Sequence, residues 1–349
     1  MSQDHFSLNS YYFDLDSKRI AQNPARRRID SKLLNVLTWP PKDLKFSQLP
    51  ELIEKKFPNG VLFVTNNTEV LRARLIGRKA SGGKVETLLF ESQDDHLWKG
   101  LFKPGRRLHV GTEIIFNEQN YGVIEEKYND GTMAMRWHGK DSVMSYMQNY
   151  GLLPLPPYIQ NFEGDSKRYQ TVYAKIPGAS AAPTAGLHFN REIMHDLSNL
   201  NCDFTELTLH VGPGTFKSIE QRDVRDYKIH GEWINVSRNC VNEVNLARNS
   251  GKPIISVGTT ALRGLETVER INGLKKPWQG VTNIYIYPGQ KIGSCDYLLT
   301  NFHLPYSSLL VLVAAFTSFD LYKQIYDYAL SSDYRFFSFG DCMLLKNNS

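Results

Sequence analysis

The chain has few cysteines, and their spacing supports neither metal binding nor a disulfide framework. Its 349 residues include four cysteines, all in the second half of the chain, at Cys202, Cys240, Cys295 and Cys342. They form no C-x-x-C pair and have no histidine at ligand spacing, which argues against a zinc site. We therefore expect no metal cofactor and a reducing compartment, the cytoplasm.

Long apolar runs are also missing. Residues 1–22 contain no apolar segment of the kind found in secretory signal peptides. The longest apolar run, at 309–316, falls well short of the ~20 residues that cross a bilayer. We expect this run to be a buried helix or strand, and we expect no membrane contact.

Neither sign of charge dominates the chain. The 41 Lys and Arg residues exceed the 36 Asp and Glu residues by a net charge of +5. Such a mild excess permits a polyanionic partner without requiring one. The length exceeds that of one ordinary core and predicts two domains.

Two sequence patterns divide the chain. Residues 61–151 contain short β-rich runs separated by Gly, Asn and Asp, a pattern that predicts a small inserted all-β domain, either a barrel or a sandwich. Residues 1–60 and 152–349 alternate helical stretches with short apolar strands, which predicts one discontinuous α/β main domain with a mixed sheet. Its expected helices cover 49–57, 191–197, 240–249, 261–272 and 318–331, and its expected strands cover 33–37, 204–209, 253–257 and 282–287.

Three loop-like segments carry a histidine beside Gly, Pro, Thr or Asn. They place His188, His210 and His303 among small, turn-forming residues, where an imidazole can approach a ligand closely. The ordinary pKa of histidine suits proton transfer near neutral pH. Each histidine taken alone is more often a polar residue that a backbone group satisfies. The three segments together predict an enzyme.

A strand-turn-helix segment follows at 254–266. An apolar strand leads to Gly258, and Thr259 and Thr260 then open a helix that carries Arg263 one turn later. Helix N-termini favour anions, and a guanidinium binds a carboxylate bidentately. Plain helix capping with an exposed Arg263–Glu266 pair explains the pattern equally well.

Two further segments could contribute to a site. Gly212 and Gly214 flank a proline in a rigid turn, with Glu232 shortly after it as an acid or base. Near the C-terminus, Arg335 is interleaved with aromatic residues and Asp341 follows a glycine. Aromatic rings beside a guanidinium suit stacking on a nucleobase, although an aromatic core strand is the more common outcome.

Basic residues gather at the start of the predicted insert. If Arg72 and Arg74 lie in one strand they share a face, and with Arg78 and Lys79 they could contact phosphates. A solvated strand face is the usual alternative.

Ten strings in the chain resemble a known family in its own order. They are IAQNP (20–24), GRKASGGKVE (77–86), PLPPYI (154–159), RYQTVYA (168–174), AAPTAGLHF (181–189), TLHVGPGTF (208–216), VGTTALRGLE (257–266), IYPG (286–289), LLTNFHLP (298–305) and YRFFSFGD (334–341). The family that they resemble is the S-adenosylmethionine:tRNA ribosyltransferase-isomerases of the queuosine pathway.

The resemblance implies a specific reaction. The ribosyl moiety of S-adenosylmethionine, a donor substrate, is transferred and isomerised onto 7-aminomethyl-7-deazaguanine at the wobble position of tRNA. The product is epoxyqueuosine-tRNA, and adenine and methionine are released. The resemblance also implies a main α/β domain with an inserted β-barrel. We expect a monomer whose partners are S-adenosylmethionine and the anticodon region of tRNA.

The implied chemistry suggests roles for the candidate residues. A proton beside a sulfonium is acidified, so a modest base removes it, and loss of adenine needs a proton donor. His188 and His210 are the candidate bases, and Asp341 and Glu232 the candidate donors. Arg263, or the turn at Thr259 and Thr260, suits the methionine carboxylate, and backbone amides near Gly186 or Gly214 suit an oxyanion. The remaining substrate-binding candidates are Thr184, Gly212, Asn301, His303 and Arg335.

The chain departs from the family pattern at a few positions. Glu69 stands for a customary Arg, Arg72 for a Pro and Lys32 for an Arg. Lysine lacks the bidentate geometry of arginine, and glutamate reverses the charge. Two alternatives therefore stay open: an S-adenosylmethionine-dependent enzyme of the same fold acting on a free base or another RNA, and a non-catalytic RNA-binding protein.

Overall fold

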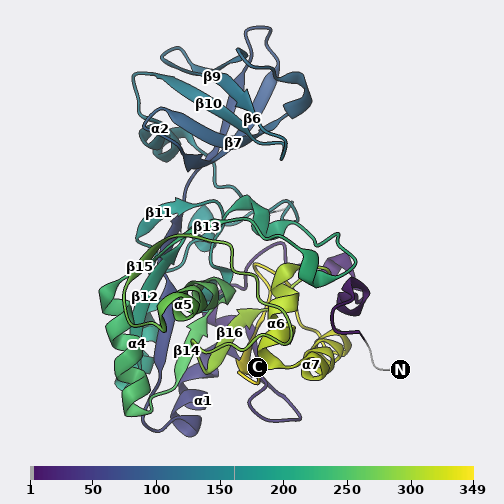
Figure 1. Cartoon of the computed structure of the whole chain (residues 1–349), viewed down its shortest axis with the longest axis vertical. Coiled ribbons are helices and arrows are strands. Elements are labelled where there is room, and N and C mark those ends of the chain that lie inside the picture. Colours follow the sequence, from purple (N-terminus) through teal and green to yellow (C-terminus); the bar gives the residue numbers. More distant parts are fainter. Residues whose placement is uncertain (1–3, 161) are drawn as a thin grey trace. The chain divides into compact units, whose positions relative to one another are not determined.

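The computed structural model describes residues 4–160 and 162–349 and divides into two compact units. Unit 1 contains the described residues up to Thr68, with Pro157–Ile176 and Ala182–Ser349. Unit 2 contains Glu69–Pro156 and Pro177–Ala181. Figure 1 shows the elements of both units.

Unit 1 is built on a nine-stranded mixed sheet, which confirms the α/β main domain. The strand order is β15 (Trp278–Thr282), β13 (Glu232–Val236), β12 (Asp203–Leu209), β3 (Leu62–Asn66), β14 (Ile254–Val257), β16 (Tyr297–Asn301), β17 (Cys342–Lys346), β1 (Lys32–Asn35) and β2 (Lys42–Lys45). The four central strands, β12, β3, β14 and β16, are mutually parallel. The strands β13 and β17 run antiparallel to their inner neighbours.

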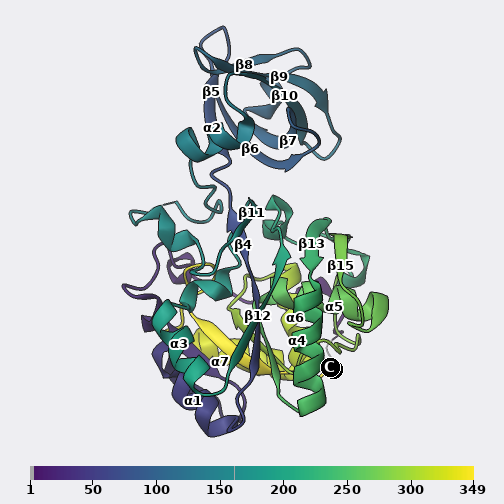
Figure 2. The ribbon, with the colours of Figure 1, turned by 90° about the vertical axis from the view of Figure 1, so that its left-hand side faces the viewer.

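Helices cover both faces of this sheet (Figure 2). On one face α1 (Leu49–Lys56) and α3 (Arg191–Asn199) bury apolar side chains against Phe63 of β3 and Leu299 of β16. On the other face α4 (Arg238–Ser250) and α5 (Thr259–Asn272) contact β12, β3 and β14. The helix α6 (Ser308–Thr317) packs on β17 and on α7 (Phe319–Ser331). The apolar run at 309–316 is therefore a buried helix.

The strand β3 shows where local pattern misleads. The sequence pattern predicts that residues 61–66 belong to the insert, but β3 lies near the centre of the main sheet between β12 and β14. All five residues of β3 are buried. A parallel strand covered by helices on both faces is apolar on both sides, and spacing alone does not separate such a strand from those of a neighbouring β domain.

Unit 2 contains the predicted β-barrel. Its closed order is β10 (Met133–Gly139), β7 (Leu97–Lys103), β6 (Lys84–Ser92), β5 (Arg74–Arg78), β8 (Glu113–Asn117) and β9 (Asn120–Lys127), and α2 (Val143–Tyr150) follows. Alternate residues point inward, and Met135 and Trp137 help to fill the interior. A closed sheet leaves no unpaired edge.

Short elements complete the described chain. A two-stranded sheet pairs β4 (Thr68–Val70) with β11 (Ile176–Ala179). Short 3-10 turns occur at η1 (Leu8–Tyr11), η2 (Ser17–Arg19), η3 (Arg28–Asp30), η4 (Phe46–Gln48), η5 (Gly105–Arg107), η6 (Ser166–Tyr169), η7 (Thr184–His188), η8 (Pro213–Phe216) and η9 (Val224–Asp226). In the part of the chain that the structure describes, no single helix has the length and hydropathy to span a bilayer, and α6 with α7 meets that test only as a pair bent by 117°.

The sheet topology brings several loops to one edge. Since β12, β3, β14 and β16 are parallel, the residues that follow them lie at the same edge of the sheet. The strands β13 and β17 begin at that edge because they are antiparallel to β12 and β16. Ligands of open α/β sheets bind outside the carboxyl ends of parallel strands.

The loop before β3 provides a test of packing in unit 1. Gly60 has φ +74°, and a Cβ there would lie 2.0 Å from the backbone oxygen of Asn201. Gly251 has φ +69°, and a Cβ there would meet nothing within 4 Å. Gly251→Ala should therefore cost only the ~1–2 kcal/mol of the left-handed conformation. Gly60→Ala should cost a further ~1–3 kcal/mol for overpacking. Denaturant unfolding of both variants measures the difference, and equal losses would contradict the close approach.

Candidate active site

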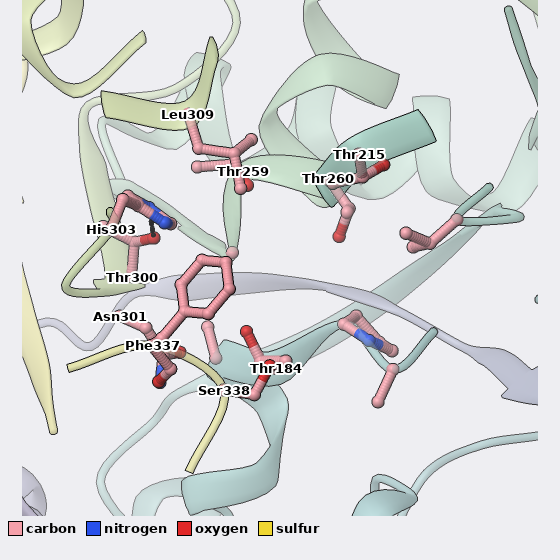
Figure 3. A pocket seen from close by; sticks show the side chains of 15 residues that line it. Thr184, Thr215, Thr259, Thr260, Thr300, Asn301, His303, Leu309, Phe337 and Ser338 are labelled. Carbon is pink, nitrogen blue, oxygen red and sulfur yellow. Dashed lines mark hydrogen bonds between the residues drawn. The ribbon is translucent and has the colours of Figure 1, made fainter. Parts of the chain in front are cut away.

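A pocket lies at this edge of unit 1 and is lined by uncharged residues (Figure 3). Its fifteen lining residues include no Asp, Glu, Lys or Arg. They are Ala182, Pro183, Thr184, Ala185, Val211, Thr215, Gly258, Thr259, Thr260, Thr300, Asn301, His303, Leu309, Phe337 and Ser338. Such a lining offers hydroxyl, amide and imidazole hydrogen bonds together with one aromatic ring, so it suits an uncharged polar ligand.

The start of α5 supplies two of the hydroxyls. Gly258 has φ +90° and joins the end of β14 to Thr259, the first residue of the helix. Because no side chain caps this helix, its first amides are available to a ligand. The buried hydroxyl of Thr260 also has no hydrogen-bond partner in the part of the chain that the structure describes. The predicted ligand-binding turn at Thr259 and Thr260 therefore lies in the pocket.

His303 lines the same pocket from the segment after β16. Its Nε2 lies 3.0 Å from Thr300 Oγ1, as drawn in Figure 3, and its backbone N–H donates to the Tyr326 hydroxyl. Burial lowers the pKa of His303 to about 3. The imidazole is therefore neutral at neutral pH and offers hydrogen bonds rather than charge.

His188 lies beside the pocket but does not line it. Its Nδ1 is 2.7 Å from Ser31 Oγ and its Nε2 is 3.3 Å from Asn301 Nδ2. Burial, followed by the positive charge of Arg335, lowers the pKa of His188 to about 3. Both ring nitrogens are engaged by protein groups, so the geometry favours a supporting role over direct proton abstraction.

His210 has one ring nitrogen free of protein partners. Its Nδ1 lies 2.7 Å from Thr68 Oγ1, and the ring stacks on Trp233 at a centroid distance of 5.0 Å. Among the described residues none bonds Nε2 of this half-buried ring. Burial lowers the pKa of His210, so the ring is neutral at neutral pH. The next residue, Val211, lines the pocket.

Glu232 and Arg263 form a buried ion pair. Both side chains are nearly inaccessible to solvent. Glu232 also accepts hydrogen bonds from the backbone of Gly212 and from Thr215 Oγ1, at 3.0 and 2.9 Å. The pair therefore fixes the turn that brings Thr215 to the pocket. The exposed Arg263–Glu266 pair that the sequence also allowed is absent, because Arg263 pairs with Glu232 and Glu266 pairs with Arg270.

Asp341 is buried, and its side chain bonds to the first residue of β1 and to the segment that precedes it. It accepts from the backbone N–H groups of Lys32 and Arg335, at 2.9 and 2.8 Å, and pairs with the Arg335 guanidinium at 3.3 Å. These contacts hold the segment that carries Phe337 and Ser338 into the pocket. Neither Asp341 nor Arg335 lines the pocket.

The candidate glycines differ in what surrounds them. A Cβ on Gly186 would lie 2.0 Å from Tyr173 Oη, and one on Gly214 would lie 2.4 Å from the His230 ring. A Cβ on Gly212 would meet nothing within 4 Å. Gly186 and Gly214 therefore permit close packing inside the protein, and the Gly186 N–H donates to Pro183 rather than to a ligand.

The basic candidates of unit 2 differ in their partners. Arg72 precedes β5, so one strand does not carry both Arg72 and Arg74, and the Arg72 guanidinium donates to the Gly151 carbonyl. Arg74 of β5 forms an ion pair with Glu86 of the neighbouring strand β6. Arg78 is exposed at the end of β5 and Lys79 follows it.

The structure adds pocket residues that the sequence analysis did not single out. They are Thr215, Thr300, Leu309, Phe337 and Ser338, with the small apolar residues around them. All but Leu309 lie within the quoted strings, so the strings located them, but no pattern showed which side chains face inward. Among the described residues, no group of three or more His, Cys, Asp or Glu side chains is placed to hold a metal ion.

The buried ion pair gives a test of the site's stability. Arg263→Met leaves the Glu232 carboxylate buried without its partner and should cost ~3–5 kcal/mol of unfolding free energy. The double variant Glu232→Gln/Arg263→Met should recover most of this loss, because the glutamine oxygen still accepts from Gly212 and Thr215. Chemical denaturation of the wild type, both single variants and the double variant measures the coupling. Additive losses would show that the pair contributes no such coupling.

The buried histidines predict a pH dependence of stability. Their folded pKa of about 3 lies below the unfolded value of ~6.5, so between these values the unfolded state binds protons that the folded state does not. The stability that each buried neutral histidine contributes is therefore fully present above pH ~6.5. It falls as the pH is lowered, by up to ~1.4 kcal/mol per pH unit for each histidine. In the acid range, His188→Gln should reduce the slope of unfolding free energy against pH by the contribution of about one proton. The exposed His195→Gln is the control, and an unchanged slope in His188→Gln would contradict the assignment.

Comparisons with known proteins converge on one family. The model of the queuosine biosynthesis protein family matches residues 8–345. The S-adenosylmethionine:tRNA ribosyltransferase-isomerase of Thermosynechococcus vestitus is 42% identical over 98% of this chain and 96% of its own length. The enzyme of the same name from Clostridioides difficile is 40% identical, with 96% of this chain and 98% of that protein covered.

A solved structure agrees with these sequence comparisons. The crystal structure of S-adenosylmethionine tRNA ribosyltransferase from Thermotoga maritima is similar to this chain with a TM-score of 0.55 and 31% identity, and the match covers 96% of this chain and 99% of that one. With matches of this length in sequence and in structure, the chain belongs to the queuosine biosynthesis protein family.

Proposed function

We propose that this chain is an S-adenosylmethionine:tRNA ribosyltransferase-isomerase. It transfers and isomerises the ribosyl moiety of S-adenosylmethionine onto 7-aminomethyl-7-deazaguanine at the wobble position of tRNA, and it releases adenine and methionine. The observation that carries the proposal is the near-complete, ~40% identical match to relatives with this activity in their names. That match favours this function over action on a free base and over a non-catalytic RNA-binding role.

The pocket of unit 1 suits the nucleoside part of S-adenosylmethionine. Adenosine is uncharged and rich in hydrogen-bonding groups, as is the lining of the pocket. The ring of Phe337 offers a face for the base. An anionic group such as a phosphate would find no cation among the lining residues.

We assign proton abstraction to His210 rather than to His188. The sulfonium acidifies the adjacent ribose C–H, so a neutral imidazole is a sufficient base. With its proton on Nδ1 toward Thr68, His210 keeps a free lone pair on Nε2. Glu232 and Asp341 act by holding the loops, because their oxygens are occupied by backbone and guanidinium donors.

We propose that the barrel contributes to tRNA binding through Arg78 and Lys79. Both lie at the β5–β6 hairpin and pair with no carboxylate among the described residues. Lysine and arginine side chains without carboxylate partners bind phosphates without reading sequence. The cytoplasmic location and the monomeric state stay predictions.

Adenine release tests the proposed function. The protein is incubated with S-adenosylmethionine and tRNA carrying the aminomethyl base, and adenine is followed by chromatography. We expect release only with that tRNA, and no loss of activity in EDTA. Release with the free base alone, or no release with any RNA, would contradict the proposal.

His210→Ala should lower turnover at least ~100-fold, whereas substitution of the exposed His195 by Ala should not.

A further inference from the structure

The side-chain amide of Asn301 is held in one orientation. Asn301 is 1% exposed, and its Nδ2 lies 3.0 Å from the Phe337 backbone carbonyl. A carbonyl oxygen only accepts hydrogen bonds, so the amide nitrogen must face it. The amide oxygen Oδ1 then points away from Phe337, and it is buried with no partner among the described residues.

The same geometry determines which nitrogen of His188 carries the proton. The second hydrogen of Asn301 Nδ2 is directed at His188 Nε2, 3.3 Å away. Nε2 must therefore hold the lone pair, and the proton lies on Nδ1, which donates to Ser31 Oγ at 2.7 Å. The Ser31 hydroxyl donates in turn to the Arg28 carbonyl at 3.1 Å. Every donor in this series of hydrogen bonds has an acceptor, whereas the opposite tautomer would point two N–H groups at each other.

Burial and charge keep this arrangement fixed. Burial and the positive charges of Arg335 and Arg28 lower the pKa of His188 to about 3, so the ring stays neutral and Nε2 stays an acceptor at working pH. The ring also packs against Phe46 at a centroid distance of 5.4 Å. His188 is thus placed to orient Asn301.

An unpartnered acceptor on a buried residue that lines a pocket implies a ligand donor. Leaving such an oxygen unbonded is costly, and a ligand N–H or O–H relieves that cost on binding. An anionic group would be repelled by Oδ1, and the lining of the pocket holds no cation to offset the repulsion.

We propose that His188 is a positioning residue that presents Asn301 Oδ1 as the acceptor for an uncharged donor on the nucleoside of S-adenosylmethionine. The donor is the exocyclic amine of adenine or a ribose hydroxyl. The inference rests on the proposed function and adds a specificity determinant to it.

Substitutions at position 188 separate positioning from proton abstraction. His188→Gln keeps an acceptor close to the position of Nε2 and should retain kcat/KM within about 10-fold of the wild type. His188→Phe removes the acceptor and should lose about 10-fold to 100-fold, as should Asn301→Ala. Equal, large losses in the Gln and Phe variants would overturn the positioning role.

Asn245→Ala is a matched control for Asn301→Ala. The Asn245 amide nitrogen also donates to two acceptors, the carbonyls of Val241 and Leu274, but it lies in α4 outside the pocket lining. The kcat/KM of the Asn245→Ala variant should stay at the wild-type value. A loss in Asn245→Ala equal to that in Asn301→Ala would assign the effect to general destabilisation and overturn the proposal.

Substrate analogues identify the donor. Three analogues of S-adenosylmethionine are used. One carries hydrogen in place of the adenine amine, one lacks the ribose 2′-hydroxyl and one lacks the 3′-hydroxyl. The analogue that lacks the true donor should cost the wild type about 10-fold to 100-fold in kcat/KM and cost Asn301→Ala nothing further. If every analogue costs both proteins the same factor, Asn301 accepts from none of these groups and the proposal fails.

A spectroscopic measurement tests the arrangement without any assay of activity. In protein labelled with ¹⁵N-histidine, the His188 signals are assigned by their loss in His188→Gln. We expect Nδ1 protonated and Nε2 unprotonated near pH 7. A proton on Nε2 would overturn the inference even if the enzyme were active. The expected tautomer together with an inactive protein would instead count against the proposed function.

Discussion

The carboxyl ends of four parallel strands meet at one edge of the main sheet, and the site depends on this constraint. The strands β12, β3, β14 and β16 deliver polar loops to that edge, and β13 and β17 begin there because they run antiparallel. Loops gathered at this edge carry buried backbone and side-chain groups, most of which bond to one another, while Asn301 Oδ1 and the Thr260 hydroxyl have no partner among the described residues. The arrangement of the pocket follows from these bonds.

Charged and uncharged residues have separate tasks at this edge. Glu232 with Arg263, and Asp341 with Arg335, lie outside the pocket lining and hold the loops that form its wall. A buried carboxylate needs a cation and further hydrogen-bond donors, and both Glu232 and Asp341 have them. The polar side-chain groups of the lining itself are hydroxyl, amide and imidazole groups. Such a division gives a rigid pocket without placing a fixed charge against an uncharged nucleoside.

The sequence predicted the fold class because the relevant signals are local. Short β runs between turn residues indicated a barrel or a sandwich, of which the structure has the barrel, and helix-strand alternation indicated the α/β domain. It did not place β3, whose membership of the main sheet depends on pairing with strands that lie about 140 and 190 residues later. The strings at 181–189, 208–216 and 298–305 located the segments of the site.

Individual roles could not be read from the same strings, because they depend on contacts between distant segments. His188 looked like a base because it stands beside glycine and threonine, yet its partners are Ser31 and Asn301, which lie 157 and 113 residues away in the sequence. Likewise, Asp341 looked like a free acid until its bonds to Lys32 and Arg335 were seen. Spacing along the chain carries no information on such hydrogen bonds, whereas the folded geometry determines them.

The most direct test of the central claim is a crystal structure of the protein with S-adenosylmethionine bound. We expect adenosine inside the pocket of unit 1, with one of its N–H or O–H groups about 3 Å from Asn301 Oδ1. An adenosine bound elsewhere, with the pocket empty and Asn301 Oδ1 still unpartnered, would contradict that claim.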